Sequence, residues 1–149
     1  EEIDLKTLDK VMRVNVRGTW LRTRAAAPLL RASGSGRVVN IASDTAIWGA
    51  PLLLSYVASK GAIISMTKSL AQEFGSDQGG ITAVAPGILT TDSTNDVSAT
   101  RHSFYNENRA VPGPQAPGDI TETISFLLTK GALTLTGQLL TVNNGFVFS

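Results

Sequence analysis

Apolar residues recur at intervals of three and four along the first part of the chain. They are Leu5, Leu8, Val11, Met12, Val14, Leu21 and Ala25. Because a helix turns once every 3.6 residues, this spacing predicts a helix from residue 4 or 6 to about residue 32. Asn15 interrupts the stripe, and asparagine is a poor residue inside a helix because its side chain competes for backbone hydrogen bonds. Two interpretations stay open: Asn15 faces the surface or bonds locally, or it distorts the helix to hold a water, which Gly18 would ease.

Two short apolar runs predict buried strands. Residues 38–42 form the first run, which ends at Ser43, and residues 81–85 form the second, which Pro86 and Gly87 break. Between them, residues 44–51 are polar or turn-forming and predict a loop. Residues 51–74 are rich in Leu, Ala, Ile, Ser and Met, which predicts a long buried or interface helix.

The last third of the chain is less regular. Residues 91–117 are polar and hold three prolines, yet Phe104 and Tyr105 indicate that the segment folds over something apolar, so we expect a substrate lid. Residues 120–129 predict a short helix and residues 138–143 a closing strand. The apolar tail with Phe146 and Phe148 is expected to be buried in a partner subunit.

The order of these elements is helix, strand, helix, strand. This order predicts an α/β fold with a parallel sheet, right-handed crossovers and helices on both faces. In such sheets ligands bind at the carboxyl ends of the strands, which is where Ser43 and Pro86–Gly87 are placed.

The composition narrows the classes of binding partner and site that we expect for this chain. The 149 residues are 42% hydrophobic and 17% charged with a net charge of +1, and no dense basic block points to nucleic acid or an anionic membrane. The absence of cysteine excludes disulfides and thiolate metal sites and fits a reducing cytoplasm, where we expect the protein to act. His102 has no second ligand at a suitable spacing, so no metal site is expected. No apolar run has the length of a membrane helix, and no signal peptide is expected.

Ser43, Tyr56 and Lys60 are candidates for proton transfer. Tyr56 and Lys60 are four residues apart and therefore share one helix face. A neighbouring ammonium would lower the pKa of the phenol, and a serine hydroxyl at the strand end could hold a carbonyl or alcohol oxygen beside it. The plainer interpretation makes Tyr56 an interface aromatic, Lys60 a solvated charge and Ser43 a helix cap.

Five motifs in register resemble the short-chain dehydrogenase/reductase family. They are Asn15 in VNVRG, Ser43 in VVNIAS, Tyr56 and Lys60 in YVASK, Pro86–Gly87 and Thr91 in APGILTT, and TGQLLTVNNG at residues 136–145. The resemblance extends over essentially the whole chain. It implies a Rossmann-type fold and an NAD- or NADP-dependent enzyme that interconverts a secondary alcohol and a ketone.

The resemblance also implies roles for the catalytic residues. Tyr56 resembles the general acid/base, and Lys60 would lower its pKa and bind the nicotinamide ribose. Ser43 would orient the substrate oxygen, and Asn15 would hold the water that links Lys60 to solvent.

The same resemblance places the cofactor and the substrate. Pro86, Gly87 and Ile88 would line the nicotinamide carboxamide, with Thr91 nearby as a polar contact. The side chains expected to shape an apolar or cyclic substrate pocket are Asp44, Trp48, Leu89, Phe104 and Tyr105. Family members are usually dimers or tetramers, so we expect a homodimer or homotetramer.

Some family features do not occur in these residues. The glycine-rich turn TGxxxGxG, the selector residue that follows the second strand and an NNAG-type stretch are not present. Residues 1–149 are therefore expected to be the carboxyl-terminal, catalytic and substrate-binding part of one longer Rossmann-type domain, and inactive alone. The alternative is a truncated, non-catalytic paralogue that serves as an oligomerisation or partner-binding module. A smaller departure is Asn143-Asn144-Gly145, where the family often has Asp-Gly-Gly.

Overall fold

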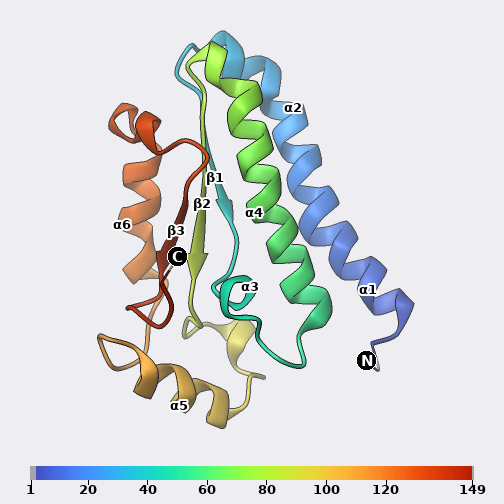
Figure 1. Cartoon of the computed structure of the whole chain (residues 1–149), viewed down its shortest axis with the longest axis vertical. Coiled ribbons are helices and arrows are strands. Elements are labelled where there is room, and N and C mark those ends of the chain that lie inside the picture. Colours follow the sequence, from blue (N-terminus) through green and yellow to red (C-terminus); the bar gives the residue numbers. More distant parts are fainter. Residues whose placement is uncertain (1–2, 149) are drawn as a thin grey trace.

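The computed structural model describes residues 3–148, which form three parallel strands with helices on both faces (Figure 1). In chain order the helices and strands are α1 (Leu5–Met12), the π-helix η1 (Arg13–Arg17), α2 (Gly18–Ala32), β1 (Arg37–Ile41), α3 (Thr45–Trp48), α4 (Leu54–Phe74), the 3₁₀ helix η2 (Gly75–Asp77), β2 (Gly80–Pro86), η3 (Asp92–Thr94), α5 (Ala99–Asn108), α6 (Gly118–Leu127), η4 (Lys130–Leu135) and β3 (Leu139–Val142).

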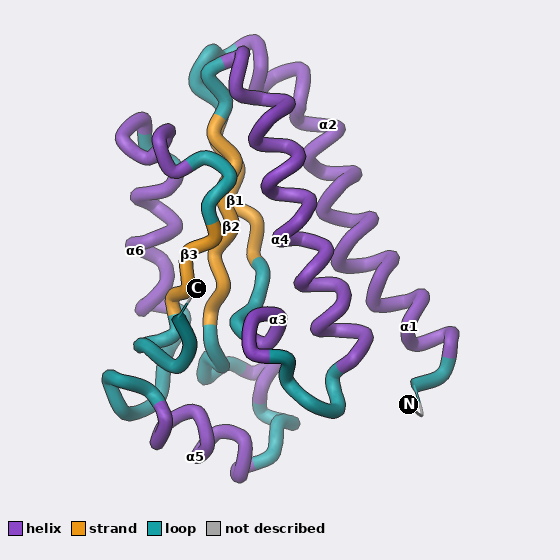
Figure 2. Tube along the Cα trace, viewed as in Figure 1, coloured by secondary structure: helices purple, strands orange, loops and turns teal. Residues whose placement is uncertain are grey.

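The strands lie in the order β1-β2-β3, and both pairings are parallel. Val39 lies opposite Thr82, and Ala83 lies opposite Leu139. Every residue of the central strand β2 is buried, as expected for a strand covered on both faces. The three strands run in one direction, toward the loops that carry α3 and α5 (Figure 2). The predicted parallel α/β architecture is confirmed.

Consecutive residues of β2 pack against helices on opposite faces of the sheet. Ala85 clusters with Ile63 of α4, whereas Val84 clusters with Leu127 of α6. Side chains alternate along a strand, so this pair builds both halves of the core. α2 lies beside α4 on one face, and α6 covers the other (Figure 1).

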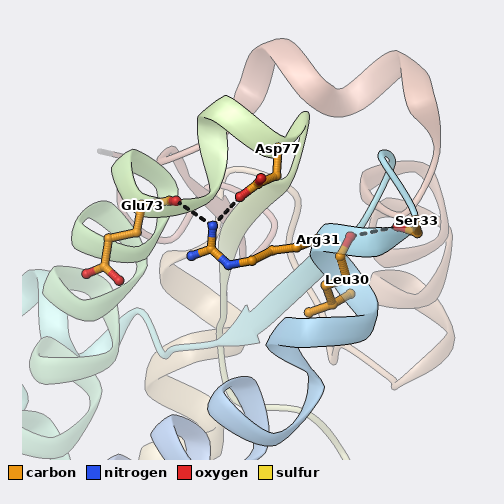
Figure 3. A network of polar contacts seen from close by, with 5 residues as sticks. All are labelled: Leu30, Arg31, Ser33, Glu73 and Asp77. Carbon is orange, nitrogen blue, oxygen red and sulfur yellow. Dashed lines mark hydrogen bonds and ion pairs between the residues drawn. The ribbon is translucent and has the colours of Figure 1, made fainter.

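The first helix has the predicted extent but is not regular. Asp4 caps it, because its carboxylate accepts a hydrogen bond from the backbone N–H of Thr7 at 2.8 Å. The helix widens into η1 around Asn15 before α2 begins. At its far end, Arg31 contacts the carboxylate of Asp77 and donates to the carbonyl of Glu73 at 3.2 Å, which joins the ends of α2 and α4 (Figure 3).

Two predicted loops contain helices. Residues 44–51 hold the single-turn α3, which ends at Gly49 in the left-handed conformation. Residues 91–117 were expected to be irregular, but they contain η3 and α5. Ser98 caps α5, accepting a hydrogen bond from the backbone N–H of Arg101 at 3.3 Å. The capped start stabilises a helix whose sequence shows no apolar stripe.

Burial of both terminal phenylalanines by a partner subunit stays a prediction, but Phe146 also packs within its own chain, where it is half-buried. Its ring stacks on Tyr105 at 4.1 Å between centroids and also contacts Trp48 and Phe104. The tail therefore folds back onto its own chain, because an aromatic cluster is available there. Phe148 remains 77% exposed.

Candidate active site

A cavity of about 710 Å³ lies at the carboxyl ends of β1 and β2, bounded by α4 on one side and α5 on the other. The sequence-predicted residues that line it are Ser43, Asp44, Tyr56, Lys60, Pro86, Gly87, Ile88, Leu89, Thr91 and Tyr105. Leu53, Ser98 and Arg101 also line it and were not predicted, since no motif marks them. The edge of the sheet expected to bind ligands is therefore hollow.

Tyr56 and Lys60 lie one turn apart on α4 and face this cavity. The Lys60 ammonium lies 5.6 Å from the centroid of the Tyr56 ring. It donates a hydrogen bond to the carbonyl of Ile41 at 2.8 Å, which ties α4 to the end of β1. Burial lowers the pKa of Lys60, because desolvation disfavours its charged form.

Ser43 is buried just beyond the end of β1, and hydrogen bonds from Thr45 orient its hydroxyl. Its oxygen accepts hydrogen bonds from the hydroxyl of Thr45 at 2.9 Å and from the backbone N–H of Thr45 at 3.3 Å. Because the oxygen is occupied as an acceptor, the Ser43 proton is free to be donated into the cavity.

The pKa of Tyr56 departs from expectation in this chain. Burial raises it, a hydrogen bond with Ser43 lowers it, and the nearby carboxylate of Asp44 raises it. The ammonium of Lys60 was expected to lower the pKa of Tyr56, but this effect is not found. The physical reason is that desolvation of the phenol outweighs its polar neighbours, while the ammonium is itself partly buried and bonded to Ile41.

Asn15 lies in η1 and connects to the active-site helix through Ser59. The Asn15 amide donates to the Ser59 hydroxyl at 2.9 Å, and that hydroxyl donates to the carbonyl of Tyr56 at 2.7 Å. The carbonyl of Asn15 accepts from the hydroxyl of Thr19 at 2.7 Å. Of the two open interpretations, the distortion of the helix is observed, since η1 is centred on Asn15, whereas the water that Asn15 was expected to hold stays a prediction.

Asn15 does not line the main cavity but a second one of about 440 Å³ between the first helix and β1. Lys60 lines both cavities. Sequence reasoning missed Ser59 as the linking residue; its signal was a small polar residue inside YVASK on the buried face of α4.

The segment after β2 presents open backbone to the cavity. A Cβ added at Gly87 would lie 3.1 Å from the Cβ of Asn143, 3.2 Å from Oδ2 of Asp44 and 3.3 Å from Nη2 of Arg109. Only glycine leaves this space clear. Together with the ammonium of Lys60 and the phenol of Tyr56, this open backbone fits the nicotinamide–ribose half of a dinucleotide.

The predicted substrate residues divide into two groups. Leu89 and Tyr105 line the cavity, and Asp44 does so with its carboxylate already bonded inside the protein. Trp48 and Phe104 do not reach the cavity and lie behind its wall in the aromatic cluster.

Arg109 is a buried cation near the site that sequence reasoning did not single out. It is 3% exposed and donates to the carbonyls of Ile88 at 2.7 Å and Gly113 at 2.6 Å. These bonds hold the segment after Gly87 in place. Its position in an irregular polar stretch gave no sequence signal.

Metal-binding clusters and membrane-spanning helices are other features relevant to function, and none is found in the described residues. No cluster of three or more His, Cys, Asp and Glu side chains suited to a metal ion occurs in residues 3–148. In His102, Nε2 lies 3.2 Å from the carbonyl of Thr94. Across the same residues, no helix combines the length and the apolar character that crossing a bilayer requires.

Comparisons with known proteins agree with this geometry. The family model described as enoyl-(acyl carrier protein) reductase matches residues 1–147. A protein of Bradyrhizobium diazoefficiens, named as a probable short-chain type dehydrogenase/reductase, is 33% identical over 147 residues, which are 98% of this chain and 52% of that protein. The chain thus spans about half the length of this relative.

Solved structures show the same fold. The structure of 4-hydroxyisoleucine dehydrogenase complexed with NADH has a TM-score of 0.90 at 28% identity, covering 98% of this chain and 61% of that one. A candidate NAD(P)-dependent gluconate 5-dehydrogenase from Beutenbergia cavernae has a TM-score of 0.92 at 30% identity, covering 97% and 59%. The chain belongs to the short-chain dehydrogenase/reductase family of oxidoreductases.

Proposed function

We propose that the full-length protein is an NAD- or NADP-dependent oxidoreductase that interconverts a secondary alcohol and a ketone. In this proposal residues 1–149 are the carboxyl-terminal, catalytic and substrate-binding part of one Rossmann-type domain. The observation that carries it is the convergence of Ser43, Tyr56 and Lys60 on one cavity at the carboxyl ends of the strands. Structures of similar fold hold NADH or NADP, which supports the cofactor class.

In the proposed reaction, Tyr56 and Ser43 of this chain would have different roles in transferring the proton. When bound, the nicotinamide ring supplies or accepts the hydride. In the reducing direction the Tyr56 hydroxyl gives its proton to the carbonyl oxygen, while the Ser43 hydroxyl holds that oxygen by a hydrogen bond. Tyr56 then regains a proton from solvent on the side of Lys60 that opens toward the second cavity.

The remaining residues would hold the cofactor and the relay. Lys60 would bind the ribose hydroxyls, Pro86, Gly87 and Ile88 would face the carboxamide, and Thr91 would add a polar contact. Asn15 would position the water of the proton relay; its bond to Ser59 supports this placement beside α4.

We also propose that the protein assembles as a homodimer or homotetramer. Large apolar side chains of the first helix are exposed in this chain: Leu5, Val14, Trp20, Leu21 and Leu29. Such surface is typical of an element covered by another chain or another part of the protein.

An oxidation assay on the full-length protein tests the proposed reaction. NADH and NADPH are each mixed with a panel of linear and cyclic ketones, and both cofactor oxidation and alcohol formation are followed. We expect one alcohol formed for each cofactor oxidised, with at least one apolar or cyclic ketone. Tight cofactor binding without turnover of any ketone or alcohol would contradict the proposal and favour the non-catalytic module.

A further inference from the structure

Asp44 joins three separate parts of the fold through its side chain. It is fully buried after β1, and its Oδ1 accepts a hydrogen bond from the hydroxyl of Tyr105 on α5 at 2.9 Å. Its Oδ2 accepts from the amide of Asn143, directly after β3, at 3.2 Å. Its backbone N–H donates to the carbonyl of Pro86 at 3.0 Å. Both carboxylate oxygens are therefore engaged inside the protein and do not depend on substrate.

Tyr105 is the one buried residue of α5. Its hydroxyl accepts a hydrogen bond from the indole N–H of Trp48 at 3.2 Å while donating to Asp44. Its ring stacks on Phe146. The other contacts of α5 come from side chains that are only partly buried or exposed, such as Phe104 against Trp48 and Phe146, and Arg101, which donates to the carbonyl of Pro51 at 3.3 Å.

Charged and titratable groups surround the Asp44 carboxylate on each side. Arg109 follows α5, and its guanidinium lies 5.5 Å from the centroid of the Tyr105 ring. The phenol of Tyr56 on α4 and the guanidinium of Arg101 on α5 line the same cavity as Asp44 and Tyr105. Asp44 and Arg109 lie on the same side of Gly87, where an added Cβ would be 3.2 Å from Oδ2 of Asp44 and 3.3 Å from Nη2 of Arg109. The carboxylate therefore also balances the buried charge of Arg109.

The pairing of Asp44 with Asn143 is complementary in hydrogen-bond chemistry. A carboxylate at both positions would place two like charges about 3 Å apart, which disfavours ionisation of both. An amide at both positions would leave a buried N–H group without a good acceptor on one side. One carboxylate and one amide can make the hydrogen bond between positions 44 and 143 in either order, although an aspartate at 143 would lose the bond that the Asn143 amide donates to the carbonyl of Val147 at 3.3 Å.

We propose that Asp44 is a positioning residue that latches α5 over the cavity, so that the wall formed by Tyr105 and the turn before α5 stays closed beside Tyr56. That turn and α5 contribute Val97, Ser98, Arg101 and Tyr105 to the cavity lining. The catalytic consequence rests on the proposed function, whereas the latch itself does not. Losing it would open the substrate side of the site, whereas Lys60 would keep its place on α4 and its hydrogen bond to the carbonyl of Ile41.

Hydrogen exchange on the full-length protein tests the latch without any assay of activity. In Asp44→Asn and in Asn143→Asp, we expect amides of residues 99–108 to exchange about tenfold faster, the cost of one buried hydrogen bond. In the double variant Asp44→Asn/Asn143→Asp the pair is restored in reverse, and exchange returns close to that of the wild type. Glu107→Gln is the matched control, because Glu107 is exposed on the same helix.

Steady-state kinetics of the same variants test whether the latch affects substrate binding at the active site. We expect Asp44→Asn to raise KM for the ketone about tenfold and the Kd of the cofactor by less than that, and the double variant to recover most of the loss in KM. Tyr105→Phe removes the hydroxyl but keeps the ring, so it should reproduce the faster exchange even where Asp44→Asn fails to fold.

Unchanged exchange of α5 in Tyr105→Phe, which necessarily removes the hydrogen bond to Asp44, would overturn the latch. The latch would also be overturned if the increases in exchange rate of the two single variants simply added in the double variant Asp44→Asn/Asn143→Asp. If the wild type turns over no ketone, the proposed reaction fails, yet the exchange experiment still decides the latch.

Discussion

Two adjacent residues act in opposite directions on the Tyr56 phenol. The Ser43 hydroxyl favours the phenolate, whereas the Asp44 carboxylate and burial favour the neutral phenol. The end of β1 therefore brings both the group that promotes ionisation and the group that opposes it. In the free chain the neutral form prevails, which suits a group that donates a proton to a carbonyl oxygen.

The Asp44 carboxylate makes a testable contribution to stability at the residue scale. Burial raises its pKa from 3.8 to about 6, against hydrogen bonds from Tyr105 and Asn143. The folded state thus binds the proton more tightly than the unfolded state. The resulting stabilisation is complete below about pH 4 and is lost as the pH rises through about 6.

Chemical unfolding of the wild type and of Asp44→Asn between pH 4 and pH 8 measures this contribution. A rise in pKa from 3.8 to about 6 corresponds to about 3 kcal/mol. We expect the difference in unfolding free energy, wild type minus variant, to fall by about that amount between pH 4 and pH 7. A difference that does not change with pH would show that the pKa of Asp44 is not raised.

At the scale of the element, the first helix adapts to Asn15 by widening into a π-helix. The widened turn allows the Asn15 amide to reach Ser59, and the hydroxyl of Thr19 bonds the Asn15 carbonyl. π-helical turns are frequent at functional sites because they re-aim a side chain. The distortion is located beside the helix that carries Tyr56 and Lys60.

Gly18 was expected to ease this distortion, but the structure gives it an ordinary helical backbone with φ −61°. A Cβ there would meet only the carbonyl oxygen of Arg13 at 3.8 Å, an ordinary contact. We therefore expect Gly18→Ala to raise the free energy of unfolding by about 0.5–1 kcal/mol, because alanine loses less backbone entropy in a helix.

Thermal or urea unfolding of Gly18→Ala checks this expectation. Gly36→Ala serves as the opposing control, because a Cβ at that position would lie 2.7 Å from the carbonyl oxygen of Leu30. That variant should be destabilised. A loss of stability in Gly18→Ala would mean that η1 does need glycine at its end.

At the scale of the whole molecule, the sequence predicts what is local and repetitive. The periods of three to four and the short apolar runs located both long helices and all three strands, and their order predicted the parallel sheet. The end of the first predicted strand placed Ser43 at the ligand-binding edge of the sheet, and the spacing of four residues placed Tyr56 and Lys60 on one helix face. α5 was missed, since its only buried residue, Tyr105, makes no stripe.

Features that depend on distant contacts could not be predicted in this way. The convergence of Asp44, Arg109 and Asn143 around Gly87 brings together segments separated by tens of residues, and no pattern marks it. The same holds for Phe146, whose burial depends on the aromatic cluster at α3 and α5. The pKa of Tyr56 also follows from burial, which a motif does not encode.

The central claim is that the Tyr56 hydroxyl moves the proton in an alcohol–ketone interconversion. Tyr56→Phe in the full-length protein keeps the ring and removes only that hydroxyl. Turnover of the reactive ketone and the Kd of NADH or NADPH are measured on the same preparation. We expect kcat to fall by about 10²- to 10⁴-fold while the Kd of the cofactor stays nearly unchanged. A variant that binds the cofactor and retains most of its turnover would contradict the central claim.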